Sequence, residues 1–257
     1  MPDLHMFNYT FLQDGPPPGV AGLLPELRRQ QNRLQLYKQE YPSIYGSLEQ
    51  AAQVQALQSA CGVHSMEGRA VEIAARNSPP INDAEKAMAG YRDALFELQL
   101  GHPPVTPCCL DLLRLHGLLL ARSSEGPKGH WREQAAPGKM GPEEIPQAME
   151  QWEEACQPLG ATPPALELLL APCLLLDFLR IAHFAPGEWR MSCLVARLLL
   201  GQAGMLLPVS WEEQARKYRS FFLAAMGQAG TCQGYWSFIE CFLGVLYLCG
   251  RQAEKAF

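Results

Sequence analysis

The residues with the clearest chemical potential lie in one short segment, Ile181 to Arg190, between two apolar stretches. His183 is a candidate general base, because an imidazole can take a proton from an attacking hydroxyl group near neutral pH. Gly187, Glu188 and Arg190 form a candidate anion loop, because a glycine turn at a helix N-terminus presents backbone N–H groups to an anion. The guanidinium adds positive charge beside that turn. The residue types of this segment are therefore compatible with an anion site.

Each of these residues also has a purely structural interpretation. His183 packs beside an aromatic neighbour if the helix end turns its side chain inward. Gly187 supplies a positive φ that the turn requires. Glu188 is favoured in the first turn of a helix by the helix dipole. Arg190 pairs with Glu188 or with Glu67. The residues alone leave both interpretations open.

Helices are expected to position this segment, because apolar residues recur along the chain with helical spacing and almost no alternating strand pattern occurs. Residues 166–181 are apolar on every side and predict the central, buried helix of an all-α fold. The glycines of residues 126–140 are compatible with a short β-hairpin flap. We expect residues 1–75 to form N-terminal helices and residues 76–257 a helical core with a C-terminal helix, in one compact domain overall. Further helices are expected at about 20–40, 48–66, 82–101, 106–120, 142–154, 188–203, 210–226 and 231–249.

Composition and charge exclude several classes of protein. The chain of 257 residues is 48% hydrophobic and 18% charged, which is typical of globular proteins. A net charge of −5 without a run of Lys and Arg argues against a nucleic-acid partner. Residues 166–181 are too short to cross a membrane, and the N-terminus shows no signal-peptide pattern. Nine cysteines without a CxxC pair and six scattered histidines predict reduced thiols in a cytoplasmic protein without a metal site.

The segment and its surroundings resemble the signature of the Fic (Fido) family, His-Pro-Phe-x-(Asp/Glu)-Gly-Asn-Gly-Arg, when it is aligned on Phe184, Gly187 and Arg190. The resemblance covers roughly residues 60–250 and implies the helical fold of that family. Further segments that resemble the family's sequence in the same order are Ser65–Gly68, Leu113–His116, Gly129–Arg132, Pro142–Trp152, Phe178–Ile181, Leu198–Gly204 and Tyr218.

The resemblance implies transfer of AMP, or of another phosphate-bearing group, to a protein hydroxyl, with ATP and Mg²⁺ as cofactors. This chain departs from the motif at the positions that perform that chemistry. Ala182 stands at the position of the family's catalytic His, and Pro186 stands at the position of its acidic metal ligand. Glu188 and Trp189 replace the Asn-Gly of the family's phosphate loop, and Cys193 replaces its second Arg. We therefore expect a pseudoenzyme or regulatory protein-interaction module, with no cofactor. The alternative is an adenylyltransferase-like (AMPylation) enzyme with altered catalytic residues, in which His183 acts and ATP with Mg²⁺ binds.

The resemblance also assigns a regulatory role. Glu67 matches the glutamate of the family's inhibitory helix, whose arginine partner corresponds to Cys193. Arg197 lies one helical turn further on, so we predict that Glu67 pairs with Arg190 or Arg197. A protein partner is expected. The aromatic residues of 235–247 belong to the core or to a homodimer surface. The remaining alternative is a purely structural helical protein whose sequence resembles the Fic family only by convergence.

Overall fold

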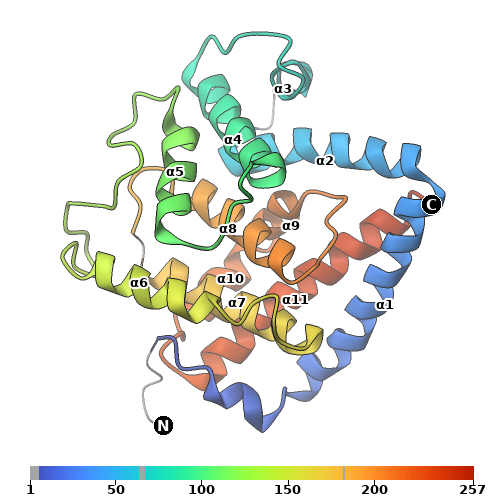
Figure 1. Cartoon of the computed structure of the whole chain (residues 1–257), viewed down its shortest axis with the longest axis vertical. Coiled ribbons are helices and arrows are strands. Elements are labelled where there is room, and N and C mark those ends of the chain that lie inside the picture. Colours follow the sequence, from blue (N-terminus) through green and yellow to red (C-terminus); the bar gives the residue numbers. More distant parts are fainter. Residues whose placement is uncertain (1–5, 64–66, 182) are drawn as a thin grey trace. The chain divides into compact units, whose positions relative to one another are not determined.

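The computed structural model describes residues 6–63, 67–181 and 183–257, except the side chain of Glu67. Within these residues the chain forms eleven α-helices and one short 3-10 helix, η1 (Thr10–Asp14), and no strand (Figure 1). The all-α fold predicted from the sequence is confirmed.

The chain divides into two compact units, and both are discontinuous in sequence. The first unit comprises the described parts of residues 1–52, 158–177 and 199–257. The second comprises the described parts of residues 53–157 and 178–198. The division into residues 1–75 and 76–257 stays a prediction.

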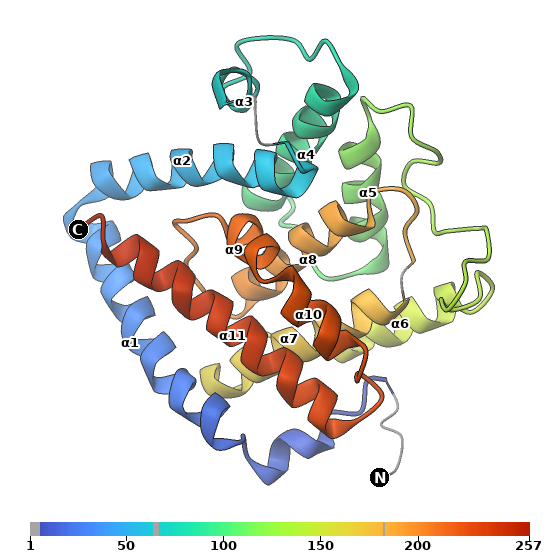
Figure 2. The ribbon, with the colours of Figure 1, turned by 180° about the vertical axis from the view of Figure 1, so that it is seen from behind.

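The first unit is built on two long helices, α1 (Pro18–Glu40) and α11 (Cys232–Glu254), which pack along each other (Figures 1 and 2). Gly250 of α11 leaves room for the Gln30 side chain of α1, since a Cβ atom there would lie 2.4 Å from the side-chain oxygen of Gln30. The shorter helices α9 (Trp211–Lys217) and α10 (Arg219–Met226) also pack on α11. Ser210 caps α9 by accepting a hydrogen bond from the Glu213 backbone N–H, at the predicted start of a helix at 210.

A buried carboxylate ties the N-terminal segment to this unit. Asp177 is fully buried on α7 (Pro164–Ile181). One of its oxygens accepts hydrogen bonds from the Phe7 backbone N–H and the Tyr9 hydroxyl, both at 2.9 Å. The other oxygen accepts from the Tyr235 hydroxyl of α11. Burial, with Asp177 adding to it, raises the pKa of Tyr9 far above its ordinary value, so the phenol stays protonated and donates.

α7 is the buried helix that its composition predicted. Every side chain from Leu168 to Phe178 is buried. Pro172 lies inside it, and the helix continues to Ile181. None of the described helices combines the length and the apolar character needed to cross a bilayer.

The second unit is centred on α4 (Asp83–Leu100) and α5 (Cys109–Leu120), which pack closely because α4 has a glycine at the contact. A Cβ atom at Gly90 would lie 2.1 Å from the Leu119 carbonyl oxygen, so no larger residue fits. α3 (Glu67–Ala74) packs on α4, and α6 (Ile145–Cys156) packs on α5. The unit also contains the end of α2 (Pro42–Cys61) and most of α8 (Glu188–Gln202). The segment that resembles the family signature, residues 181–190, is called the motif segment below.

The hairpin predicted for residues 126–140 is not formed. These residues make an irregular loop with turns and contain no strand. Gly126, Gly129 and Gly138 all have positive φ, and Pro127 and Pro137 have no N–H group to give to a strand ladder. The loop instead donates one backbone hydrogen bond to the motif segment, from the Arg132 N–H to the His183 carbonyl, at 2.8 Å.

Several helices differ from the sequence prediction at their ends: α6 begins at Ile145 rather than at 142, and residues 210–226 form two helices, α9 and α10. α2 begins at Pro42 rather than near Ser47, whose hydroxyl donates to the Ser43 carbonyl from inside the helix. α5 begins at Cys109 rather than at Thr106, because the Asp111 carboxylate accepts from both the N–H and the hydroxyl of Thr106. That carboxylate holds the residues before α5 in a turn.

Candidate functional site

The motif segment, described from His183 to Gly187, joins the end of α7 to the start of α8 in the second unit. Gly187 has φ +89°, in the left-handed region that favours glycine. A Cβ atom there would also lie 3.3 Å from a methyl carbon of Leu119 on α5. The turn geometry and the close packing therefore both require this glycine, whatever the segment binds.

His183 is buried in an aromatic cluster. Its ring lies 4.2 Å from Phe178, 4.4 Å from Phe184 and 5.3 Å from Trp131, measured between ring centroids. The residue is 1% exposed, and neither ring nitrogen has a hydrogen-bond partner among the described residues. Burial lowers the pKa of His183 to about 3, with smaller contributions from the neighbouring His116 and Arg132. The imidazole is therefore neutral at physiological pH and a weak base.

A second histidine, His116 on α5, holds the motif segment in place. Its Nδ1 accepts a hydrogen bond from the Gly129 backbone N–H at 3.2 Å, which leaves the ring proton on Nε2. Nε2 then donates to the Pro186 carbonyl at 2.9 Å. His116 is fully buried, and burial lowers its pKa. Both nitrogens are engaged, so this histidine positions the segment; the sequence marked it by the Leu-x-Leu-His resemblance but did not reveal this role.

Arg190 is paired with a residue that the sequence did not single out. Its Nη2 donates to the carboxylate of Glu125 at 2.6 Å. Glu125 lies in the loop after α5, where its N–H donates to the Ser123 hydroxyl and shapes a turn. Arg190 is 9% exposed, and its Nη1 has no partner among the described residues. The arginine that a phosphate would need is therefore already neutralised from within the chain.

Glu188 occupies the first turn of α8 and is half-buried. Its nearest cation is Lys139, at 3.8 Å. Burial raises the pKa of Glu188, against the opposing effect of Lys139 and Arg132. This position agrees with the helix-dipole interpretation, in which the carboxylate faces the positive end of α8.

A cavity of about 370 Å³ opens beside the motif segment, and its charged lining is mainly negative. Three carboxylates line it, from Asp83, Glu125 and Glu188, against the single guanidinium of Arg190. Among the described residues no group of three His, Cys, Asp or Glu side chains is placed to hold a metal ion. Such a lining is electrostatically unfavourable for a polyphosphate, because three carboxylates line it against one guanidinium.

The predicted regulatory pair stays a prediction. The side chain of Glu67 lies outside the described residues, and so do Ser65 and Met66, which precede it in the inhibitory-like element. Ala182, which the resemblance aligns with the family's catalytic His, also lies outside them. Arg197 lies half-buried on α8. The partner that the structure gives Arg190 is Glu125.

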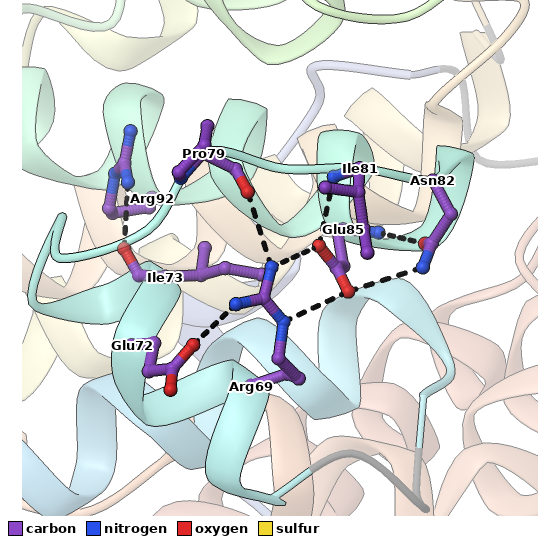
Figure 3. A network of polar contacts seen from close by, with 8 residues as sticks. All are labelled: Arg69, Glu72, Ile73, Pro79, Ile81, Asn82, Glu85 and Arg92. Atoms are coloured by element: carbon purple, nitrogen blue, oxygen red, sulfur yellow. Dashed lines mark hydrogen bonds and ion pairs between the residues drawn. The ribbon is translucent and has the colours of Figure 1, made fainter.

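A polar network fixes the helix that begins at Glu67 (Figure 3). Arg69 on α3 donates to both carboxylate oxygens of Glu85 on α4, at 3.1 and 2.6 Å. Glu85 is 1% exposed and also accepts from the Ile81 backbone N–H and the Asn82 side-chain amide (Figure 3). Because Asp83, Ala84 and Ala87 of the same helix line the cavity, the network joins α3 to the cavity wall.

The network predicts a pH-dependent effect of Glu85→Gln. The hydrogen bond from Arg69, followed by that from the Ile81 N–H, lowers the pKa of Glu85. A carboxyl group with a lowered pKa in the folded state contributes stability above its unfolded pKa of about 4.3 and loses it as the pH falls through the folded pKa. We therefore expect Glu85→Gln to lower the melting temperature more at pH 7 than at pH 3, measured by circular dichroism. Glu72→Gln, which removes the more exposed carboxylate on Arg69, is the matched control with a small effect. An equal loss for Glu85→Gln at both pH values would contradict the prediction.

Comparison with known proteins identifies the fold. No family model and no curated protein matches the sequence. A Fic family protein from Desulfovibrio desulfuricans G20 is similar in structure, with a TM-score of 0.73 and 17% identity, over 99% of this chain and 77% of that chain. A Fic domain-containing signaling protein from Bacteroides thetaiotaomicron VPI-5482 has a TM-score of 0.64 and 16% identity, over 92% and 98%. Fic-1 from C. elegans has a TM-score of 0.65 and 12% identity, over 92% and 71%. The chain therefore has the fold of the Fic (Fido) proteins.

Proposed function

We propose that this chain is a Fic-fold pseudoenzyme that lacks ordinary AMP transfer and acts as a regulatory module by binding a protein partner. The observation that carries the proposal is the pair between Arg190 and Glu125. A triphosphate in the motif cavity would have to displace Glu125 from the arginine and accept the carboxylates of Asp83 and Glu188 as neighbours. Both requirements cost binding free energy that a transferase site normally gains from its arginine and metal.

The state of His183 supports the same proposal. A general base needs a pKa near the working pH and an open path to the substrate proton. His183 has a pKa of about 3 and lies buried among Phe178, Phe184 and Trp131. Acting as a base would require the aromatic cluster to open. The proposed role of this residue is therefore to pack the segment.

The nine free cysteines support a cytoplasmic location as part of the proposal. All nine lie in the part of the chain that the structure describes. His116, Gly187 and the Arg190–Glu125 pair hold the loop in a fixed conformation. Because these contacts need no bound nucleotide, the proposed role of the loop is to bind a protein partner. A homodimer is one form that such a partner could take.

Nucleotide titration tests the proposal. We expect calorimetry to find no Mg²⁺-dependent binding of ATP, or of CDP-linked donors, tighter than about 1 mM, which corresponds to only about 4 kcal/mol. Glu125→Gln should strengthen any residual ATP binding, because it releases Arg190, whereas Glu133→Gln, an exposed carboxylate of the same loop, should not.

Two outcomes would reject the pseudoenzyme proposal. One is a micromolar, Mg²⁺-dependent dissociation constant for ATP. The other is auto-AMPylation, seen as added mass in the intact protein, that is abolished by His183→Ala. The second result would establish the alternative, a transferase with altered catalytic residues.

A further inference from the structure

A second cavity of the second unit, of about 350 Å³, has a different character from the one at the motif segment. It lies among residues of α2, α4 and the end of α3. Its only charged lining residues are Arg76 and Arg92, and its neutral polar ones are Gln53 and Gln99. No carboxylate lines it among the described residues. In a chain of net charge −5, this is a local concentration of positive charge with hydrogen-bond donors.

The positive charge around this cavity is only partly neutralised. Three arginines share one carboxylate, that of Asp93 on α4. Arg92 donates to one of its oxygens at 2.9 and 2.6 Å, and Arg76 approaches the same oxygen at 3.5 Å. Arg122 donates to the other oxygen at 3.2 and 3.1 Å. The two lining arginines, Arg76 and Arg92, therefore share one carboxylate that Arg122 also engages, so their positive charge is only partly neutralised and attracts an anion.

The backbone of Arg76 shows that the chain keeps an arginine where glycine fits best. Its φ is +60°, in the left-handed region. Its N–H donates to the Ile73 carbonyl, and the Asn77 N–H donates to the Glu72 carbonyl, which together form the Schellman ending of α3. The residue with positive φ in a Schellman ending is usually glycine, and a residue with a side chain is strained there. This ending places the Arg76 side chain at the rim of the cavity.

The two arginines are held in different ways. Arg92 is fixed, because it also donates to the Ile73 carbonyl at 2.7 Å, at the end of α3 (Figure 3). Arg76 has no such anchor. Its guanidinium lies 4.7 Å from the centroid of the Phe96 ring, and its side chain is 54% exposed. Arg92 is thus fixed at the cavity with Asp93 as its ion-pair partner, and Arg76 is the more exposed cation at the rim.

The rest of the cavity is apolar. Leu57 and Leu95 are buried beneath it, and Phe96 and Leu100 are 47% and 59% exposed at its rim. A volume of about 350 Å³ is at the small end of ligand cavities, which span about 300–1,000 Å³. We infer that this cavity binds a small organic anion, with its phosphate or carboxylate group on Arg76 and Arg92 and an aromatic or aliphatic body against Leu57, Leu95 and Phe96.

The test uses phenyl phosphate as the probe, since it combines an anion with an aromatic body. Inorganic phosphate and phenol each supply one half of that chemistry. In calorimetry at low ionic strength we expect phenyl phosphate to bind with a dissociation constant below about 1 mM, and the other two to bind at least about tenfold more weakly. Added salt should weaken the binding of phenyl phosphate.

Arg76→Gly separates binding from folding. Glycine adopts the positive φ without strain, so the melting temperature should stay unchanged or rise. Loss of the guanidinium should weaken phenyl phosphate binding by about tenfold or more. Arg29→Gln removes the same charge from an exposed position on α1 and should leave the affinity within about twofold.

The inference is overturned if phenyl phosphate does not bind at about 10 mM, a concentration at which even a weak site fills. Equal affinities for phenyl phosphate and inorganic phosphate would also overturn it, because the apolar wall would then contribute nothing. An unchanged affinity in Arg76→Gly would place any binding elsewhere. None of these results depends on ATP binding at the motif segment.

Discussion

Lowering the pH from 7 to 4 should cost the protein about 3 kcal/mol of unfolding free energy through His183 alone. The unfolded histidine takes up a proton near pH 6.5, whereas the folded one, with a pKa of about 3, does not. Between these two values the unfolded state binds more protons, so stability falls as the pH falls, by about 1.4 kcal/mol for each pH unit.

His183→Leu isolates this contribution. Leucine has a similar volume and no ring nitrogens, so the variant should be as stable as the native protein or more stable at pH 7, because two unpaired buried nitrogens are removed. Urea unfolding at pH 7 and pH 4 should show its advantage growing by about 3 kcal/mol toward acid. Carboxylates and His116 titrate in both proteins and cancel in the comparison. A constant difference between the two proteins would mean that His183 is accessible and ordinarily basic.

Replacing Asp177 by alanine should destabilise the protein by about 3–5 kcal/mol. The carboxylate accepts three hydrogen bonds, from the Phe7 N–H and the hydroxyls of Tyr9 and Tyr235. Its removal leaves these three donors without their acceptor in a buried site, and each unpaired group costs about 1–3 kcal/mol. The loss should be visible as a lower urea midpoint.

A graded series separates the hydrogen bonds from the packing at this site. Tyr9→Phe removes one donor and keeps the ring that packs near Tyr235, so it should cost only about 1 kcal/mol. Hydrogen exchange adds a local measurement, in which the Phe7 amide should lose protection in Asp177→Ala. If Asp177→Ala were no more destabilising than Tyr9→Phe, the carboxylate would not be the acceptor that links these groups.

Most helices were predictable because local features specify their ends, whereas α3 was not predicted. Ser210 and Asn82 cap α9 and α4 close to the predicted starts at 210 and 82, and α1 ends at Glu40 as predicted. The buried helix at 166–181 follows from its uniform hydrophobicity. The order of the Fic-like marks was enough to predict the fold, although the identity to the similar structures is at most 17%.

The side-chain pairs were not predictable in the same way. Asp177 binds partners 168 and 170 residues away, and Arg190 binds one 65 residues away in an irregular loop. No periodicity relates such positions. The sequence named Glu188 and Glu67 as partners for Arg190, because both are marked by helix position or motif, and it passed over Glu125, which has neither. Glu85 was likewise unmarked, since a buried, paired glutamate looks in sequence like any exposed one.

The location of Glu125 bears on any attempt to rebuild a transferase from this chain. Restoring the family's residues at 182, 186, 188 and 189 alters only the motif segment, and Glu125 lies outside it. A rebuilt loop would still meet this carboxylate on its arginine at 2.6 Å. The effects of the motif substitutions and of a neutral residue at 125 are therefore coupled. We expect the motif substitutions to raise transferase activity only when residue 125 is also neutral. Under the proposed function, motif substitutions alone should therefore give no measurable AMP transfer while Glu125 stays in place.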